Sequence, residues 1–93
     1  MIKTVSFRGE ELTPVIGQYA NGQTSIQLID QNGYDYITAS VAHDISIGTD
    51  QVIIKNYSEN EGILEALIQS GIIEKPFMTI PVNFVTLHVT TLI

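Results

Sequence analysis

The sequence predicts an α+β fold in which an antiparallel sheet of about five to six strands carries a single α-helix on one face. Ile, Val and Thr contribute 15, 7 and 9 of the 93 residues, and β-branched side chains pack well in pleated sheets. Two short turn sequences, Asn21-Gly22 and Gln31-Asn32-Gly33, separate extended runs as they do in β-hairpins. One later segment, residues 58–71, instead has its apolar residues at helical spacing.

The first two predicted strands are joined by a turn at Gly9-Glu10-Glu11. Met1–Arg8 alternates, with Val5 and Phe7 on one face. Leu12–Ala20 follows as a second extended run. It contains Pro14, which has no N–H to donate to a β-ladder, so we expect this strand to lie at an edge or to be bulged there.

The next two strands extend the sheet into a four-stranded antiparallel meander. Thr24–Asp30 follows the Asn21-Gly22 turn and places Ile26 and Leu28 on one face. Tyr34–Val41 alternates as well. Its expected inward residues are Ile37, Ala39 and Val41, and its expected outward residues are Tyr34, Tyr36, Thr38 and Ser40.

The second half of the chain predicts a loop, a short strand and the helix. Ala42–Gln51 reads as a loop and Val52–Lys55 as a strand. Ser58 and Glu61 have the spacing of a capping box, in which each side chain satisfies a backbone donor at the helix start. The predicted core-facing residues of the helix are Ile63, Leu64, Leu67 and Ile68, and Gly71 is expected to end it. Asn60 has no role in this capping scheme.

The C-terminal part predicts an irregular stretch bracketed by Pro76 and Pro81, followed by one last strand at Val82–Leu92. Alternation there places Val85, Leu87 and Val89 inward and Thr86, His88 and Thr90 outward. We expect this strand to return to the sheet. A chain of this length forms one domain, so residues 1–93 are treated as a single unit.

Composition limits the classes of function. Ten acidic and four basic residues give a net charge of −6, which argues against a surface that binds nucleic acid by neutralising phosphates. Without Cys the chain has no disulfide, thiol nucleophile or cysteine-bound zinc. The alternating, doubly charged start of the chain does not resemble a signal peptide, and no apolar run reaches the length of a membrane span. We therefore expect a cytoplasmic protein with no membrane association.

No constellation of residues predicts catalysis or a cofactor. The helix start carries Glu59 and Glu61, which repel a phosphate. His43 and His88 lack the spacing of a zinc-binding pair, and no Gly-x-Ser-x-Gly sequence supplies an activated nucleophile. The chain is therefore predicted to be non-enzymatic, with no catalytic residue and no bound cofactor.

Two surface features remain open to interpretation. The acidic residues are either a surface that occupies a basic nucleic-acid groove on another protein or a means of keeping a small protein soluble. Tyr34 and Tyr36 are predicted to share the outward face of their strand, with Phe84 and His88 outward on the last strand. Aromatic residues of this kind are enriched at interfaces, although a second element or a dimer partner covering this face accounts for them equally well.

Several blocks together resemble a family of short proteins encoded by plasmids, conjugative elements and phages of gut and lactic-acid bacteria. These blocks are Gly17-x-Tyr19-Ala20-Asn21-Gly22, Ile26-Gln27-Leu28, Leu67-Ile68-x-x-Gly71 and, most specific, Lys55-Asn56-Tyr57-Ser58-Glu59-Asn60-Glu61-Gly62. Ala42-His43 departs from the Val-Asn typical of that family. The family has no assigned activity, so the resemblance implies no catalytic residue. It implies a mobile genetic element, whose small acidic proteins often inhibit host defence, as anti-CRISPR and anti-restriction proteins do.

These observations lead to one functional hypothesis and two alternatives. The hypothesis is a protein-binding inhibitor of a host defence nuclease, such as a CRISPR effector, with no direct nucleic-acid binding. The expected binding residues are Tyr34, Tyr36, Asp50, Glu59 and Glu61. The alternatives are a self-associating structural or regulatory protein, for example a homodimer, and a metal-binding protein that uses His43 and His88.

Overall fold

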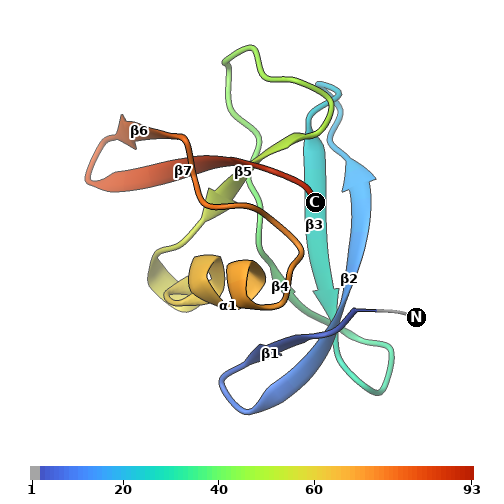
Figure 1. Cartoon of the computed structure of the whole chain (residues 1–93). Helices are drawn as coiled ribbons and strands as arrows, with labels where there is room; N and C mark the ends of the chain where they lie inside the picture. Colours follow the sequence, from blue (N-terminus) through green and yellow to red (C-terminus); the bar gives the residue numbers. More distant parts are fainter. Residues whose placement is uncertain (1–2) are drawn as a thin grey trace.

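The computed structural model describes residues 3–93 and confirms an α+β fold with a single α-helix (Figure 1). The strands number seven rather than five or six, and they form two antiparallel sheets instead of one. The first sheet has the strand order β1-β2-β3-β4 and the second has the order β5-β7-β6. The C-terminal strand therefore does not return to the first sheet, as the sequence had suggested, but forms the centre of the second.

The first sheet begins with strands β1 (Val5–Phe7) and β2 (Glu10–Gln18). Their turn lies at Arg8-Gly9, where both residues have a positive φ, of 52° and 80°, so Glu10 and Glu11 belong to β2 and not to the turn. The predicted extension of the first strand to Met1 and Ile2 lies outside the described residues. β1 pairs with β2 only as far as Leu12, and Pro14 therefore occupies an edge-like part of β2, as expected.

Two tight turns complete the meander where the sequence predicted them. Strand β3 (Thr24–Ile29) pairs with β2 across the Asn21-Gly22 turn, and Gly22 there has a φ of 86°. Strand β4 (Asp35–Thr38) follows the second turn, in which Asp30 Oδ1 accepts from the N–H groups of Asn32 and Tyr34. Side-chain acceptors of this kind stabilise turns that contain Asp or Asn.

Strand β4 is shorter than predicted, and the chain beyond it joins the two sheets. Residues 39–41 continue past β4 and contact strand β5 (Gln51–Lys55), with Ser40 opposite Ile54. Ser40 is buried and not outward-facing, because its Oγ accepts from the N–H of Ile26 at 2.8 Å. Ala39 is buried as expected.

The second sheet contains strands β6 (Met78–Val82) and β7 (Val85–Thr91), which form a hairpin. The stretch between Pro76 and Pro81 is thus largely a strand and not irregular, and Val82–Leu92 is interrupted by the turn at residues 83–84. Pro81 is tolerated because β6 is an outer strand, where one backbone edge has no partner. Leu87 and Val89 are buried as predicted, but Thr90 is buried too, with its Oγ1 donating to the Glu74 carbonyl.

The helical region begins differently from the predicted capping box. Ser58–Asn60 forms a 3-10 turn, η1, and the helix α1 spans Ile63–Gln69. The cap is supplied by Asn56, whose Oδ1 accepts from the N–H groups of Gly62 and Leu64 at 3.1 and 2.9 Å. Asn56 can do so because Gly62, at φ 97°, turns the chain back over it.

Gly71 ends the helix as predicted, with φ 75°. The N–H groups of Gly71 and Ile72 donate to the carbonyls of Ile68 and Leu67, the pair of bonds that defines a Schellman motif. Ile63 and Leu67 are fully buried, and Leu64 and Ile68 pack against the same core.

Two apolar clusters fill the space on either side of β5. The larger cluster lies between the first sheet and α1 and includes Val52 and Ile54. The smaller cluster contains Ile53, Leu87 and Val89. Ile45 and Ile47 of the loop before β5 cover it, so the run Val52-Ile53-Ile54 is buried on both faces.

Candidate functional site

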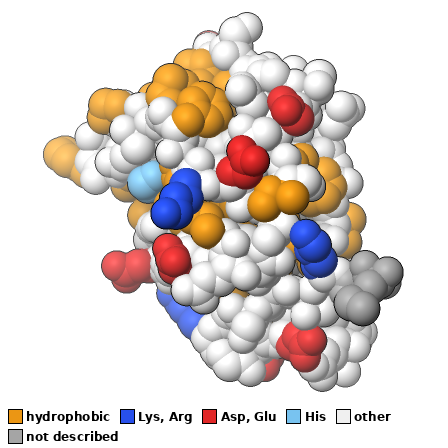
Figure 2. Space-filling model, viewed as in Figure 1, with side chains coloured by type: hydrophobic (Ala, Val, Ile, Leu, Met, Phe, Trp, Pro, Cys, Tyr) orange, Lys and Arg blue, Asp and Glu red, His pale blue; other side chains and the backbone are white. Residues whose placement is uncertain are grey.

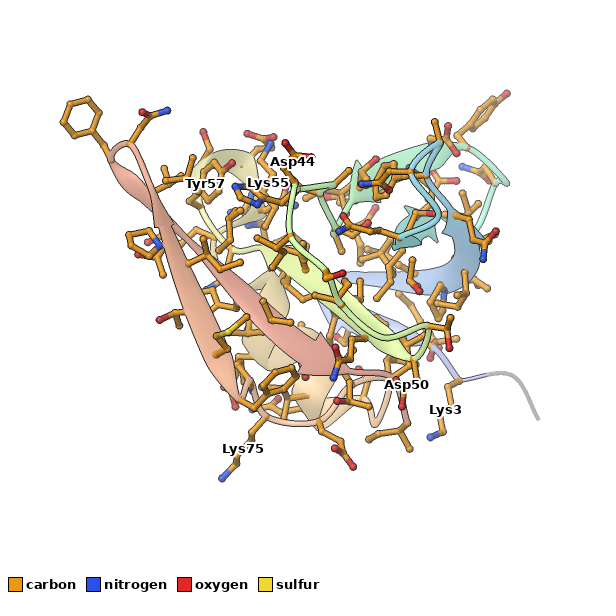
Figure 3. The ribbon with its side chains drawn as sticks, turned by 90° about the horizontal axis from the view of Figure 1, so that it is seen from above. Lys3, Asp44, Asp50, Lys55, Tyr57 and Lys75 are labelled. Carbon is orange, nitrogen blue, oxygen red and sulfur yellow. The ribbon has the colours of Figure 1, made fainter. Side chains whose placement is uncertain are left out.

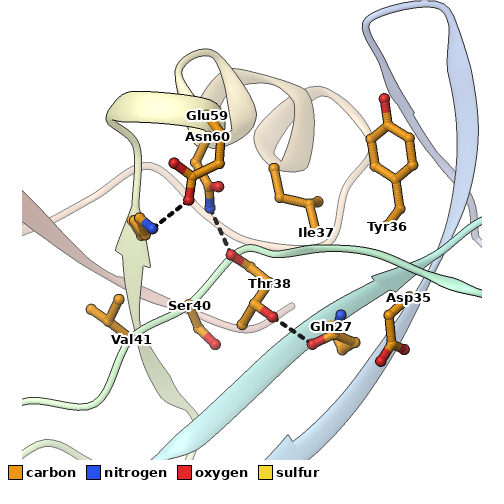
Figure 4. A pocket seen from close by; sticks show the side chains of 10 residues that line it. Gln27, Asp35, Tyr36, Ile37, Thr38, Ser40, Val41, Glu59 and Asn60 are labelled. Atoms are coloured by element: carbon orange, nitrogen blue, oxygen red, sulfur yellow. Dashed lines mark hydrogen bonds and ion pairs between the residues drawn. The ribbon is translucent and has the colours of Figure 1, made fainter.

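A groove of about 520 Å³ lies between the outer strand β4 and the turn η1 (Figure 4). β4 supplies one wall and the segment around Lys55, Glu59 and Asn60 supplies the other. The groove forms because residues 39–41 pair with β5 whereas β4 itself has no strand on that side. The residues that line it are Gln27, Asp35, Tyr36, Ile37, Thr38, Ser40, Val41, Lys55, Glu59 and Asn60.

Asn60 closes the upper wall of the groove against β4. The residue is 1% exposed, and its Nδ2 donates to the Thr38 carbonyl at 2.6 Å. This side chain takes the place that a neighbouring strand would occupy beside Thr38. The other amide atom, Oδ1, is buried and has no hydrogen-bond partner. Leaving a buried acceptor without a donor costs about 1–3 kcal/mol, which offsets part of the stabilisation from the bond to Thr38.

Lys55 and Glu59 form an ion pair at the rim of the groove, with 2.6 Å between Nζ and Oε1. It is the single ion pair found among residues 3–93. The hydrogen bond to Glu59 raises the pKa of Lys55, and the bond from Lys55 lowers the pKa of Glu59. Lys55 Nζ also lies 5.4 Å from the centre of the Tyr57 ring, within the range of a cation–π contact. Both charged states are therefore favoured at neutral pH.

The groove brings together two of the five residues predicted to bind a partner. Tyr36 and Glu59 lie on its opposite walls. Tyr36 is the extra residue at a bulge in β4, because Ile37 pairs with Leu28 but Asp35 pairs with the next residue, Ile29. Tyr34 lies in the preceding turn and is 70% exposed. The bulge thus breaks the strict alternation that had placed the two tyrosines on one strand face.

The other two predicted residues lie away from the groove. Asp50 precedes β5 and Glu59 follows it, and five residues of strand between them span about 17 Å. Figure 3 shows Asp50 and Lys55 at opposite ends of this strand. Glu61 is exposed beyond η1, and its carbonyl accepts from Arg8 Nη2 at 3.1 Å. The acidic surface predicted around the helix start is therefore divided between the two ends of β5.

On the face seen in Figure 2, a small number of charged side chains lie among larger areas of uncharged residues. The basic groups are mostly engaged within the chain. Lys3 Nζ donates to the Gly71 carbonyl, Arg8 donates to the Glu61 carbonyl and Lys55 pairs with Glu59. Most of the ten carboxylates lack such a cation, so the surface as a whole is acidic.

An exposed aromatic residue occupies the tip of the β6–β7 hairpin. Phe84 is fully exposed, and it follows Asn83, which has a φ of 54°. The sequence had placed Phe84 on the outward face of the last strand beside His88. It lies instead in the two-residue turn, because β7 starts at Val85. The base of the hairpin also exposes Phe77 and Met78.

His43 lies in a second cavity, of about 400 Å³, in the loop before β5. Its backbone N–H donates to Gln23 Oε1, and its Nδ1 is buried without a partner. Within residues 3–93, no three His, Asp or Glu side chains come together in a way that would hold a metal ion. The structure thus does not assemble a metal centre around His43 and His88.

The residues that sequence reasoning missed are Lys55 and Asn60. Lys55 and Glu59 are four residues apart, but this spacing signals an ion pair only in a helix, and here Lys55 ends β5 and Glu59 lies in the turn η1. Asn60 stood out as the one residue without a role in the predicted capping box.

Among the described residues, no helix has the length and apolar character needed to cross a membrane. No family model, curated protein or solved structure matches this chain.

Proposed function

We propose that this chain is a non-enzymatic protein-binding module of a mobile genetic element and that it inhibits a bacterial defence nuclease by covering its nucleic-acid-binding surface. The observation that supports this proposal most directly is the charge balance. A net charge of −6 lies on a domain whose Lys3, Arg8 and Lys55 are all held in internal contacts. Such a surface attracts the basic grooves with which nucleases bind phosphates.

The ion pair in the groove supports a binding role over a catalytic one. A general base at neutral pH requires a carboxylate whose pKa is raised, and a nucleophilic lysine requires a lowered pKa. Glu59 and Lys55 are shifted in the opposite directions by their mutual hydrogen bond. Both groups are thus stabilised in their charged and chemically passive forms.

The experiment that tests the proposal is affinity capture followed by an assay on the captured protein. The tagged chain is incubated with lysate of a candidate bacterial host at about 0.15 M salt, at which charges closer than about 8 Å still interact strongly. We expect one dominant nuclease subunit that is released at higher salt. The purified nuclease should then lose nucleic-acid binding when the chain is added in stoichiometric amount.

An unrelated protein of similar size and charge serves as the control, because any acidic protein captures some basic ones. Recovery of the same nuclease by both proteins, or a nuclease that still binds its nucleic acid, would contradict the proposal. Recovery of the bait alone would favour the self-associating alternative. In that case, sedimentation equilibrium over a range of protein concentrations would show a mass above 10.2 kDa.

A further inference from the structure

We infer that the second half of β2, residues 14–18, pairs with the same segment of a second copy of this chain, edge to edge and antiparallel, across a two-fold axis at Gly17. This pairing goes beyond the proposed function, because binding a nuclease requires no dimer. The two surfaces also differ, since β3 lies between this edge and the groove beside β4. The pairing follows from three features of the edge: its outward backbone groups, its exposed apolar side chains and its lack of charge.

The second half of β2 is an open edge that lacks the protection found on the other outer strands. β1 pairs only with the first half of β2, and among residues 3–93 no strand lies beside residues 14–18 on that side (Figure 1). β1 itself has three residues, β4 is bulged and bonded by Asn60, and β6 contains Pro81. Short strands, bulges and proline are devices that prevent edge-to-edge pairing. The edge of β2 is therefore the one left available for it.

The hydrogen bonds of the β2–β3 hairpin determine which backbone groups point to this edge. The Tyr19 N–H donates to the Gln23 carbonyl at 2.8 Å, so this pair is a hydrogen-bonded one. Hydrogen-bonded pairs alternate along an antiparallel ladder, and in the register of β2 with β3 the even-numbered residues of this half face outward. Ile16 and Gln18 thus direct both N–H and C=O groups to the open edge. Pro14 faces outward too, so its missing N–H costs β2 no bond to β3.

These outward groups define one self-complementary register. With the two-fold axis at Gly17, Ile16 of each copy lies opposite Gln18 of the other, and every outward N–H and C=O of these two residues has a partner. An axis at Ile16 would instead set the Gln18 carbonyl opposite Pro14, which has no N–H to donate. Because both copies use the same edge, the assembly closes at two chains.

Apolar side chains lie exposed on both faces of this edge. Val15 and Ile16, neighbours that point to opposite faces of the strand, are 50% and 48% exposed. Ile16 borders a groove of about 310 Å³ whose lining includes Ile72, Leu92 and Ile93. In the register with the axis at Gly17, the Ile16 side chains of the two copies are diagonal neighbours across the strand pair, within reach of each other. Pairing would therefore remove apolar surface from water as well as satisfy the backbone.

The distribution of charge favours a second copy as the occupant of this edge. Residues 12–29 contain no charged side chain. Two chains with a net charge of −6 repel each other over the rest of their surfaces, so an uncharged edge is where they can approach. A basic partner would instead be attracted to the carboxylates, which lie elsewhere in the chain.

Sedimentation equilibrium of the isolated chain tests the pairing. Interfaces as small as one strand edge are weak, so the measurement runs from micromolar to millimolar protein concentration. We expect the mass to rise with concentration from 10.2 kDa toward twice that value and no further. A mass that stays at 10.2 kDa up to millimolar concentration would overturn the inference. A mass that continues to rise beyond two chains would overturn the closed two-fold arrangement.

Amide hydrogen exchange followed by NMR locates the interface residue by residue. The N–H groups of Ile16 and Gln18 face outward, so their exchange should slow as the protein concentration rises. The N–H of Gly17 points to β3 and should be protected at every concentration. A doubled mass with unchanged exchange at Ile16 and Gln18 would place the interface elsewhere and overturn the assignment.

Matched variants separate this edge from general effects of charge. Ile16→Lys places two like charges beside the two-fold axis and should weaken association about tenfold or more. Met78→Lys makes the same change in net charge on the outer strand β6, at a residue of similar exposure, and should leave association nearly unchanged. An equal loss for both variants would overturn the inference.

Ile16→Pro tests the backbone bonds alone. It removes an outward N–H that β3 does not use, as Pro14 already does one turn of the pleat earlier. We expect this variant to keep the circular dichroism spectrum of the wild type and to sediment as a single chain. A folded Ile16→Pro variant that still pairs as tightly as the wild type would overturn the proposed register. Nuclease inhibition by such a monomeric variant would leave the proposed function in place, so the two proposals are tested separately.

Discussion

Asn60 binds Thr38 through a 2.6 Å hydrogen bond from Nδ2 to the backbone carbonyl, and this contact joins the turn η1 to the outer strand of the first sheet. The bond lies two residues before Ser40, where the two sheets meet through Ser40 and Ile54. The Asn60 side chain thus continues, at Thr38, the hydrogen bonding that the backbone of β5 makes with residues 39–41. The consequence is a groove with a fixed wall and not a flexible gap between two sheets.

Replacing Asn60 should destabilise the protein. Asn60→Ala removes the bond to Thr38 but also the unpartnered Oδ1, so we expect a loss of about 1–2 kcal/mol in the free energy of unfolding. Asn60→Asp should cost more, because a buried carboxylate then faces the Thr38 carbonyl. Urea denaturation measures both changes. Asn32→Ala, in an exposed turn, is the control, and a stable Asn60→Asp variant at neutral pH would refute this role.

The helix cap can be tested with two neighbouring residues. Asn56→Ala removes the acceptor for the N–H groups of Gly62 and Leu64, and we expect a loss of about 1 kcal/mol, typical of a lost N-cap. Ser58→Ala should change stability by less than about 0.5 kcal/mol, because Ser58 does not cap the helix. Thermal unfolding followed by circular dichroism measures both. The reverse order of the two losses would support the capping box that the sequence suggested.

The Lys55–Glu59 pair predicts a specific dependence on pH. The pKa of Glu59 is lowered mainly by the hydrogen bond from Lys55, so its stabilising effect is present above the usual glutamate pKa and is lost as pH falls through the lowered value. The pKa of Lys55 is raised, so its effect is present below 10.5 and is lost as pH rises through the raised value. The effect on stability should be small because the pair is at the surface.

NMR titration of the Glu59 side-chain carboxyl measures this shift directly. We expect its midpoint below 4.5, the ordinary value for a glutamate. In Lys55→Gln the midpoint should rise, because the main donor to the carboxylate is gone. Lys75→Gln, with the same change in net charge, should leave it nearly unchanged. A Glu59 midpoint that is identical in the wild type and in Lys55→Gln would show that the pair does not form in solution.

The tip of the β6–β7 hairpin should tolerate a polar residue. Phe84 is fully exposed, so Phe84→Ser removes no buried area and should change the free energy of unfolding by less than about 0.5 kcal/mol. Leu87→Ala, at a buried position in the adjoining strand β7, should cost about 2–5 kcal/mol. Urea denaturation at low protein concentration compares the two. A large loss for Phe84→Ser would mean that this ring packs against protein in solution.

The sequence was informative wherever a local rule decides the structure. The Asn21-Gly22 and Gln31-Asn32-Gly33 turns both formed as predicted, because Gly22 and Gly33 accept a positive φ; the acceptor role of the Asp30 side chain was not predicted. The helix stop at Gly71 depends on the same conformational freedom. Val52–Lys55 was predicted as a short strand, and it forms β5; its β-branched residues favour extended structure.

The predictions failed where contacts between residues far apart in the sequence decide the structure. Ser40 alternates in sequence with exposed residues but is buried, because its hydroxyl serves the backbone of Ile26. Ser58 and Glu61 have the spacing of a capping box, yet the side chain of Asn56 caps the helix instead. The positive φ of Gly62 brings the helix start beside Asn56. The junction between the two sheets likewise depends on residues 39–41 pairing with β5, a contact for which no local pattern exists.

The candidate site shows the same division between features set by local sequence and features set by distant contacts. The sequence by itself determined the acidic charge, the turns and the residue types from which a binding surface can be built, because these depend on composition and on neighbouring residues. Only the tertiary structure decided that Tyr36 and Glu59 share a groove while Asp50 lies at the far end of β5. The physical reason is that a groove is a relation between segments some 20 residues apart, set by the pairing of β5 and the bond from Asn60 to Thr38.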